Sequence, residues 1–331
     1  MADKPFPILF IAGTRIGDAV LSSGLIKRLH DEIPHARFTI AAGPPAAPLF
    51  ADVPNLDRVI VMAKRKWSGH WFALWAQVRG RRWGLIVDMR GSGVSGFLSR
   101  RRRAVYHRRP GAEPVHKVIE AARVLGVEDN PPAPYLFTSP ETEAAAAALL
   151  PPGGPILAIA PGANWVGKTW PAERFAETAA RLLAHDGPLS GGRLLILGSA
   201  ADREAGRAVK LAISRDRVIA ADPGKLDLLT TYACLKRVRL FIGNDSGAMH
   251  LAAAAGAPTI GLFGPSDERL YGPWGPLGRV VRGSRDLEAI RKVDAELNQA
   301  VCHMFDLSVE SVVDAATRML KETEARVAAD L

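Results

Sequence analysis

The sequence predicts an α/β fold with two doubly wound parallel sheets. Short apolar runs alternate with amphipathic stretches along the chain, the pattern expected of strand–helix units on a parallel sheet. The length of 331 residues exceeds that of a typical single domain and fits two domains of roughly 150 residues each. We therefore expect each half to carry its own sheet and its own buried core.

Two sets of five apolar runs define the expected sheets. The predicted strands are 7–12, 37–42, 58–62, 84–88 and 104–107 in the first half, and 155–160, 193–197, 217–220, 239–242 and 258–263 in the second. Residues 128–150 are rich in Pro and Ala, which predicts a linker with one short helix. We place the boundary at residue 150, giving domains 1–150 and 151–331. The last amphipathic stretch predicts a helix with Ser308 as its N-cap, and we expect it to pack back on the first domain.

Positive charge is concentrated in the first half. Residues 1–150 hold 21 Lys and Arg against 13 Asp and Glu, so +8 of the formal net charge of +9 lies there. The excess is densest in 64–67, 79–83 and 99–109. Such a surface attracts phosphates or carboxylates on nucleic acid, anionic lipid or an acidic glycan, and it equally fits a solvated face. The tryptophans between Trp67 and Trp83 fit helix packing as well as base stacking or lipid contact.

Cysteine content and hydropathy bear on where the protein works. Cys234 and Cys302 are too few for a disulfide framework and lack metal-ligand spacing. The apolar run near the N-terminus is shorter than a signal-peptide core or a membrane span. We therefore expect a cytoplasmic protein, and we expect any contact with a membrane to be peripheral.

The loop after the first predicted strand carries Arg15, Gly17 and Asp18. In open α/β sheets ligands bind beyond the carboxyl ends of the strands, so such loops are candidate sites. Asp18 falls where the next helix should start, and an Asp there commonly caps the helix. A carboxylate at the mouth of a cleft can also act as a general base toward a hydroxyl nucleophile.

Two loops match nucleotide-binding spacings. The stretch after strand 84–88 spells G-x-G-x-x-G, but it follows the fourth unit and lacks the acid expected about 20 residues on, which disfavours NAD(P) binding. The stretch PGANWVGKTWP fits the P-loop spacing and ends in Lys168 and Thr169. Pro171 is favoured at a first helical position, which would start the helix after both residues and disfavours a P-loop NTPase. Lys168 with nearby Asn164 and Thr169 can still meet a phosphate.

The stretch after strand 239–242 suits a phosphorylated sugar. Ser246 and Gly247 would present backbone N–H groups at a helix N-terminus, which is an anion site. Asp245 beside them suits the hydroxyls of a sugar attached to that phosphate. Alternatively, Asn244, Asp245 or Ser246 only cap the helix. His250, one turn into the helix, fits either a role in the pocket or a structural one.

Three motifs together resemble the ADP-heptose:lipopolysaccharide heptosyltransferase family. They are R-x-G-D at 15–18, P-G-A…K-x-W-P at 161–171, and G-N-D-S-G-A-M-H-L at 243–251 followed by G-x-F-G-P. The resemblance spans nearly the whole chain. It implies a GT-B architecture of two Rossmann-like domains facing across a cleft, with the acceptor bound by the first and the nucleotide-sugar by the second.

The resemblance implies an inverting, metal-independent transfer of heptose from ADP-heptose to the inner core of lipopolysaccharide, with Asp18 as catalytic base. No cofactor or resident metal is expected, and the chain has no D-x-D pair to hold one. The donor would contact Asn164, Lys168, Thr169, Ser199, Asp202, Asn244, Asp245, Ser246, Gly247 and His250. The acidic lipopolysaccharide-core acceptor, at the cytoplasmic face of the inner membrane, would contact Arg15, Gly17, Arg90, Arg101 and Arg102.

One departure from the family pattern concerns the nucleoside. Family members often carry an acid shortly after the Gly-Ser strand end, whereas here Ala200 and Ala201 follow Ser199. Either Asp202 binds the ribose or the nucleotide preference differs. A transferase or epimerase acting on another sugar nucleotide, a P-loop NTPase and a nucleic-acid-binding protein remain as alternatives.

Overall fold

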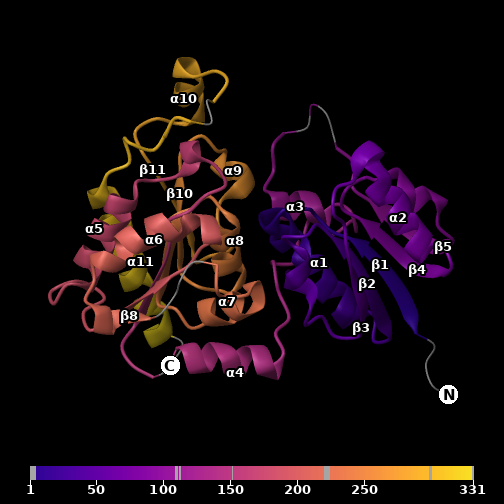
Figure 1. Cartoon of the computed structure of the whole chain (residues 1–331), viewed down its shortest axis with the longest axis horizontal. Coiled ribbons are helices and arrows are strands. Elements are labelled where there is room, and N and C mark those ends of the chain that lie inside the picture. The colour runs from indigo at the N-terminus through magenta and orange to yellow at the C-terminus, as the bar shows by residue number, and fades with distance from the viewer. Residues whose placement is uncertain are drawn as a thin grey trace. The chain divides into compact units, whose positions relative to one another are not determined.

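The structure is a computed structural model that describes residues 5–108, 111, 113–150, 152–219, 224–297 and 300–329. The chain divides into two compact units, Met1–Ser139 and Pro140–Leu331, and each contains one parallel sheet with helices packed on it (Figure 1). The division precedes residue 150, where the sequence analysis placed it. Helix α4 (Pro140–Leu149), which we assigned to the linker, packs on α7 (Leu228–Leu235) of the second unit.

The first unit has a five-stranded sheet in the order β3-β2-β1-β4-β5. Its strands are β1 (Phe6–Ile11), β2 (Ala36–Ala42), β3 (Leu56–Val61), β4 (Trp83–Asp88) and β5 (Arg100–Val105). Its helices are α1 (Ile16–Glu32), α2 (Gly69–Val78) and α3 (Lys117–Ala122). The order of the strands reverses between β1 and β4, and the carboxyl ends of strands at such a switch point are where doubly wound sheets bind ligands.

The apolar runs of the first half form the buried centre of this sheet. Ile8, Leu9 and Phe10 of β1 are fully buried, as expected of a strand covered on both faces. Strand β5 differs from its predicted position at 104–107 because its arginines belong to the strand. It lies at the sheet edge and pairs only with β4, so its backbone can bond while residues 101–103 stay exposed. Arg109, the end of the basic stretch, lies outside the described residues.

The second unit has a six-stranded sheet in the order β11-β10-β9-β6-β7-β8. Its strands are β6 (Ile156–Ala160), β7 (Arg193–Ile196), β8 (Val218–Ile219), β9 (Leu240–Asn244), β10 (Thr259–Phe263) and β11 (Gly278–Arg282). The further helices are α5 (Ala172–Leu183), α6 (Arg203–Leu211), α8 (Gly247–Ala254), α9 (Glu268–Tyr271), α10 (Leu287–Val293) and α11 (Val309–Ala329). The switch point falls between β6 and β9. Strand β11 was not predicted, and residue 220, the end of the predicted strand 217–220, lies outside the described residues.

The C-terminal helix α11 begins where the sequence predicts. The Ser308 hydroxyl oxygen accepts a hydrogen bond from the Ser311 N–H at 3.1 Å, which confirms Ser308 as the cap. Within its own unit α11 packs on α5 and β11, and Arg239 binds it through the Thr323 hydroxyl at 2.6 Å and the Leu320 carbonyl at 2.9 Å. No helix within the described ranges has the length and apolar character needed to span a membrane.

Candidate active site

Asp18 lies at the switch point of the first sheet but does not cap a helix. Helix α1 begins at Ile16 with Arg15 as its N-cap residue, so Asp18 is the third helical residue. No side chain or backbone group of the described residues donates a hydrogen bond to its carboxylate. The capping interpretation is therefore wrong, and the carboxylate oxygens remain able to accept a proton.

The surroundings of Asp18 favour a carboxylate that can take up a proton. Desolvation raises the pKa of Asp18, and the positive charges of Arg15 and Lys117 partly oppose this effect. Lys117 begins α3, which packs on α1, and it forms an ion pair with Glu120, whose other oxygen accepts from the Tyr106 hydroxyl. Lys117 could not be predicted from the sequence, because it is far from Asp18 in the chain and belongs to no motif.

The loop after β4 places Arg90 beside the loop that carries Arg15 and Gly17, because β4 pairs with β1 and Asp88 is in register with Ile11. The buried Asp88 carboxylate shapes this loop by accepting from the Arg90 N–H at 3.1 Å and the Ser92 hydroxyl at 2.7 Å. The Arg90 guanidinium stacks on Trp71 at 4.6 Å. These loops form one basic edge around Asp18.

Arg101 and Arg102 lie apart from this basic edge. Arg102 is in register with Leu85, three residues before Asp88, which puts it about 10 Å back along the strand. Successive residues of a strand point to opposite faces, so the two arginines also face different sides of the sheet. The structure thus groups Arg15, Gly17 and Arg90 but not Arg101 and Arg102.

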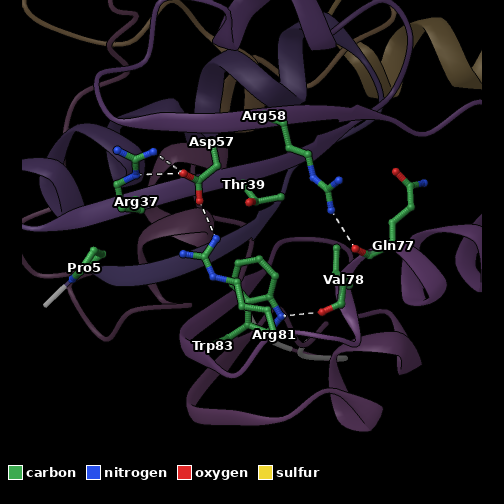
Figure 2. Close-up of a pocket in the computed structure, with 9 residues that line it drawn as sticks. All are labelled: Pro5, Arg37, Thr39, Asp57, Arg58, Gln77, Val78, Arg81 and Trp83. Carbon is green, nitrogen blue, oxygen red and sulfur yellow. Dashed lines mark hydrogen bonds and ion pairs between the residues drawn. The ribbon is translucent and has the colours of Figure 1, made fainter.

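A cavity of about 370 Å³ opens at the opposite, amino edge of the first sheet (Figure 2). Its cations already have protein partners. Asp57 accepts from Arg37 at 2.6 Å and from Arg81 at 2.5 Å, and Arg58 donates to the Gln77 carbonyl at 2.7 Å. Burial raises the pKa of Asp57, but the hydrogen bonds from both arginines outweigh it and lower the pKa. We assign this network to stability, because parallel sheets bind ligands at the other edge.

The switch point of the second sheet brings Lys168 and Asp245 together. The Lys168 ammonium lies 2.6 Å from Asp245 Oδ2, although the two residues come from different loops, after β6 and after β9. Asp245 is 5% exposed, and Lys168 is 21% exposed. His250 Nε2 on α8 lies 4.0 Å from the other oxygen, Asp245 Oδ1. A phosphate or sugar hydroxyl that reaches this pair meets a cation and an acceptor side by side.

Asn244 holds the two loops together instead of facing a ligand. Its side chain is fully buried, its Oδ1 accepts from the Trp170 N–H at 3.1 Å, and its Nδ2 donates to the Pro161 carbonyl at 2.8 Å. We predicted that Asn244 contacts the donor or caps α8, but its polar side-chain atoms bond to the backbone of the other loop instead. Its hydrogen bonds fix the position of the loop that carries Lys168.

Replacing Asn244 by Ala is expected to lower the free energy of unfolding by about 2–3 kcal/mol, because the Trp170 N–H and the Pro161 carbonyl would lose their partner. Chemical denaturation of the two proteins measures the difference. Asn164→Ala, a change at an exposed residue of the loop that Asn244 holds, is the matched control and is expected to stay within about 0.5 kcal/mol of the parent. Equal losses in the two variants would contradict the positioning role.

Ser246 is placed at the helix N-terminus without capping it. It is the N-cap residue of α8, yet its side chain makes no capping hydrogen bond. Its Oγ is buried and has no hydrogen-bond partner among the described residues. Because Asn244 and Asp245 are also engaged elsewhere, the interpretation that these residues only cap the helix fails. Ser246 and the N–H of Gly247 are left to meet an anion.

The P-loop interpretation of residues 161–171 is wrong. Helix α5 starts at Ala172 with Pro171 as its N-cap residue, so Lys168 and Thr169 precede the helix. A Cβ on Gly162 would lie 2.0 Å from Asp202 Oδ1, and one on Gly167 would lie 1.9 Å from the Trp165 ring. Both glycines are thus explained by close packing. The Thr169 hydroxyl donates to the Trp165 carbonyl at 3.0 Å, and Asn164 is exposed.

Asp202 lies at the rim of the same loop. Its Oδ2 accepts from the Ser199 N–H and from the Ser199 hydroxyl, each at 2.7 Å, while Oδ1 is the atom that faces Gly162. Ser199 and Asp202 therefore form one polar group next to the loop that carries Lys168. Among the described side chains, no three of His, Cys, Asp or Glu gather as a metal site.

Two Rossmann-like sheets, each with polar loops at its switch point, make up a two-domain α/β fold of the GT-B type. The sequence profile of glycosyltransferase family 9 (heptosyltransferase) matches residues 54–300, and the chain belongs to this family. This confirms the resemblance and the prediction of an α/β, GT-B-like enzyme. The matched region includes Lys168 and Asp245, whereas Asp18 precedes it.

Curated relatives and solved structures cover nearly the same length. Lipopolysaccharide heptosyltransferase 2 of Salmonella typhimurium is 23% identical over 95% of this chain and 99% of its own. Lipopolysaccharide heptosyltransferase 1 of Pseudomonas aeruginosa is 27% identical over 81% of each. The structure of E. coli ADP-heptose lipopolysaccharide heptosyltransferase II superposes with a TM-score of 0.74 at 22% identity, covering 96% of this chain and all of that one.

Proposed function

We propose that this protein transfers a heptose from ADP-heptose to the inner core of lipopolysaccharide, with inversion and without a metal ion. The observation that carries the proposal is the Lys168–Asp245 pair next to the Ser246 hydroxyl, which has no hydrogen-bond partner in the described part of the chain, at the switch point of a family 9 chain. The substrates are inferred from those of the heptosyltransferase relatives. The roles of individual residues are inferred from their positions in this chain.

The second unit would bind the donor. The Lys168 ammonium, the Ser246 hydroxyl and the first N–H groups of α8 would balance the diphosphate charge. Asp245 would accept hydrogen bonds from heptose hydroxyls, with His250 behind it. Asp202 and Ser199 would meet the ribose. Asn244 would act only by holding the loop in place.

The first unit would bind and activate the acceptor. Asp18 would take the proton of the acceptor hydroxyl while that oxygen attacks the anomeric carbon and ADP leaves with the bonding electrons. A base of raised pKa is better matched to proton uptake than an Asp of ordinary pKa. Arg15 and Arg90 would attract the acidic core saccharide.

Replacing Lys117 by Met is expected to move the acidic limb of the pH–rate profile to higher pH. Lys117 lowers the pKa of Asp18, so its removal raises that pKa further. The base acts when it is ionised, and activity is lost as the pH falls through its pKa. The profile of kcat/KM measures the shift. Lys27→Met is the control, because it removes a cation on α1 that is paired with Asp31. An identical shift of the acidic limb in the two variants would contradict the assignment of that limb to Asp18.

Calorimetric titration with ADP, ATP, UDP, GDP and dTDP, each measured with magnesium and again with EDTA, tests the donor assignment. We expect ADP to bind most tightly and to bind equally well in EDTA. A preference for UDP would contradict ADP-heptose as the donor. Binding of ATP only in the presence of magnesium would instead support an NTPase.

We place the protein peripherally at the cytoplasmic face of the inner membrane, where a lipid-anchored core acceptor would be accessible. The basic edge around Asp18 supports this location, because the cytoplasmic leaflet carries anionic lipid and the acceptor itself is acidic.

A further inference from the structure

The turn before α2 and the first turn of α2 together expose two large aromatic side chains. Trp67 is 99% exposed and Phe72 is 70% exposed, whereas Trp83 at the end of the same tryptophan-rich stretch is 2% exposed and belongs to the core. Trp67 lies in the short 3-10 turn Lys66–Ser68, and Phe72 lies in the first turn of α2, which follows directly. These two side chains lie five residues apart in the chain, and exposed apolar surface of this kind, when contiguous, marks an interaction site.

The backbone holds Trp67 in an unfavourable conformation. Trp67 has φ +54° and Ser68 has φ +56°, so two successive residues with a Cβ occupy the left-handed region. Such residues are disfavoured there and cluster at functional sites. Here the turn directs the indole into solvent, where it makes no packing contribution. The conformation is therefore not explained by the fold of the first unit alone.

Three exposed cations precede these aromatic side chains. Lys64, Arg65 and Lys66 are all exposed, and a Cβ on Gly69 would lie 3.7 Å from the Arg65 Cβ, so the base of the Arg65 side chain lies near the start of α2. The whole stretch between Asp57 and Asp88 contains no acidic residue and seven Lys and Arg. We call the surface formed by Lys64, Arg65, Lys66, Trp67 and Phe72 the aromatic–basic patch.

We propose that the aromatic–basic patch docks on an anionic phospholipid bilayer. Indole and phenyl rings partition into the headgroup region, and adjacent Lys and Arg side chains are attracted to anionic headgroups. Trp71, one residue before Phe72, stacks under Arg90 at 4.6 Å, so the patch continues into the basic edge around Asp18. The docking would bring that edge to the surface in which a lipid-anchored acceptor lies.

This purpose rests on the proposed function, but the docking itself does not. Base stacking by a nucleic acid could use the same aromatic side chains and cations. The bilayer is favoured because Trp67 directly precedes α2 and Phe72 lies on it, beside cations, while Leu74 and Val78 of the same helix are buried in the core. Exposed aromatic side chains next to Lys and Arg on such a helix suit a membrane interface.

Flotation of the full chain with vesicles that contain no lipopolysaccharide tests the docking. The wild type is expected to bind vesicles of phosphatidylcholine with phosphatidylglycerol, and Trp67→Ser with Phe72→Ser is expected to bind them about tenfold more weakly. Lys64→Gln with Lys66→Gln should weaken binding to these vesicles and make the residual binding less sensitive to salt. Leu211→Ser with Phe305→Ser, which changes exposed apolar residues of the second unit, is the control and should bind as the wild type does.

Two readouts separate this proposal from the proposed function. The aromatic double variant should keep the wild-type ADP affinity and the wild-type rate with a soluble, lipid-free core acceptor. Failure of the wild type to bind ADP would contradict the proposed function. Flotation would then still test the docking independently. Docking is overturned if the wild type ignores the anionic vesicles or if the aromatic variant floats equally well. It is also overturned if the patch binds RNA in a gel shift while ignoring vesicles.

Discussion

Asp18→Asn is expected to lower kcat for heptose transfer by about 10²–10⁴-fold, the usual contribution of a general base. An amide has nearly the same shape as the carboxylate but cannot take the proton of the acceptor hydroxyl. No described residue hydrogen-bonds to the Asp18 carboxylate, so the substitution breaks no protein contact. Because desolvation disfavours the ionised form, the variant should be at least as stable as the parent. Steady-state kinetics measures kcat, and chemical denaturation measures the free energy of unfolding.

Asp31→Asn is the matched control, since Asp31 lies on the last turn of the same helix and pairs with Lys27. It should leave kcat unchanged, and both variants should bind ADP as the parent does. Full transfer activity in Asp18→Asn would remove Asp18 from the catalytic role, however well the protein binds ADP.

Lys168→Met is expected to have two separable effects in the second unit. Loss of a charged contact to the diphosphate should weaken ADP binding by about 10–100-fold. The buried Asp245 carboxylate would also lose its partner at 2.6 Å, which should cost about 3 kcal/mol of stability. Calorimetry with ADP measures the first effect, and chemical denaturation measures the second.

The double variant Lys168→Met with Asp245→Asn separates the two effects. It removes both charges, so most of the lost stability should return, while ADP binding should stay weak. If ADP affinity recovered together with stability, Lys168 would be a structural residue and the diphosphate would be bound elsewhere.

The sequence predicts the centre of each sheet better than its edges. Buried strands such as β1 and β6 appear as continuous apolar runs because both of their faces are covered. Strand β5 is built largely of arginines, and β11 has the short sequence GRVVR with exposed residues. An edge strand needs only one hydrogen-bonded neighbour, so its residues carry little hydrophobic pattern. The short helix predicted within the linker is α4, but composition could not show that it belongs to the second unit, because that depends on its packing against α7.

The candidate site was predictable at the level of loops but not of contacts. The rule that ligands bind after the carboxyl ends of strands led to Asp18, Lys168 and Asp245. It could not show that Lys168 and Asp245 form a pair, because they lie on different loops. It also could not distinguish Asn244, which has its polar atoms engaged by the backbone, from Ser246, whose hydroxyl is unpartnered. These side-chain contacts depend on tertiary packing and cannot be predicted from the spacing of residues in the sequence.

Transfer of heptose from ADP-heptose to a heptose-free lipopolysaccharide core, measured in EDTA, tests the central claim most directly. The proposed function predicts that ADP is released only when the acceptor is present, that one heptose is added to the core, and that the anomeric configuration is inverted. Consumption of ADP-heptose at the same rate without acceptor, with an epimerised sugar nucleotide as product, would contradict it.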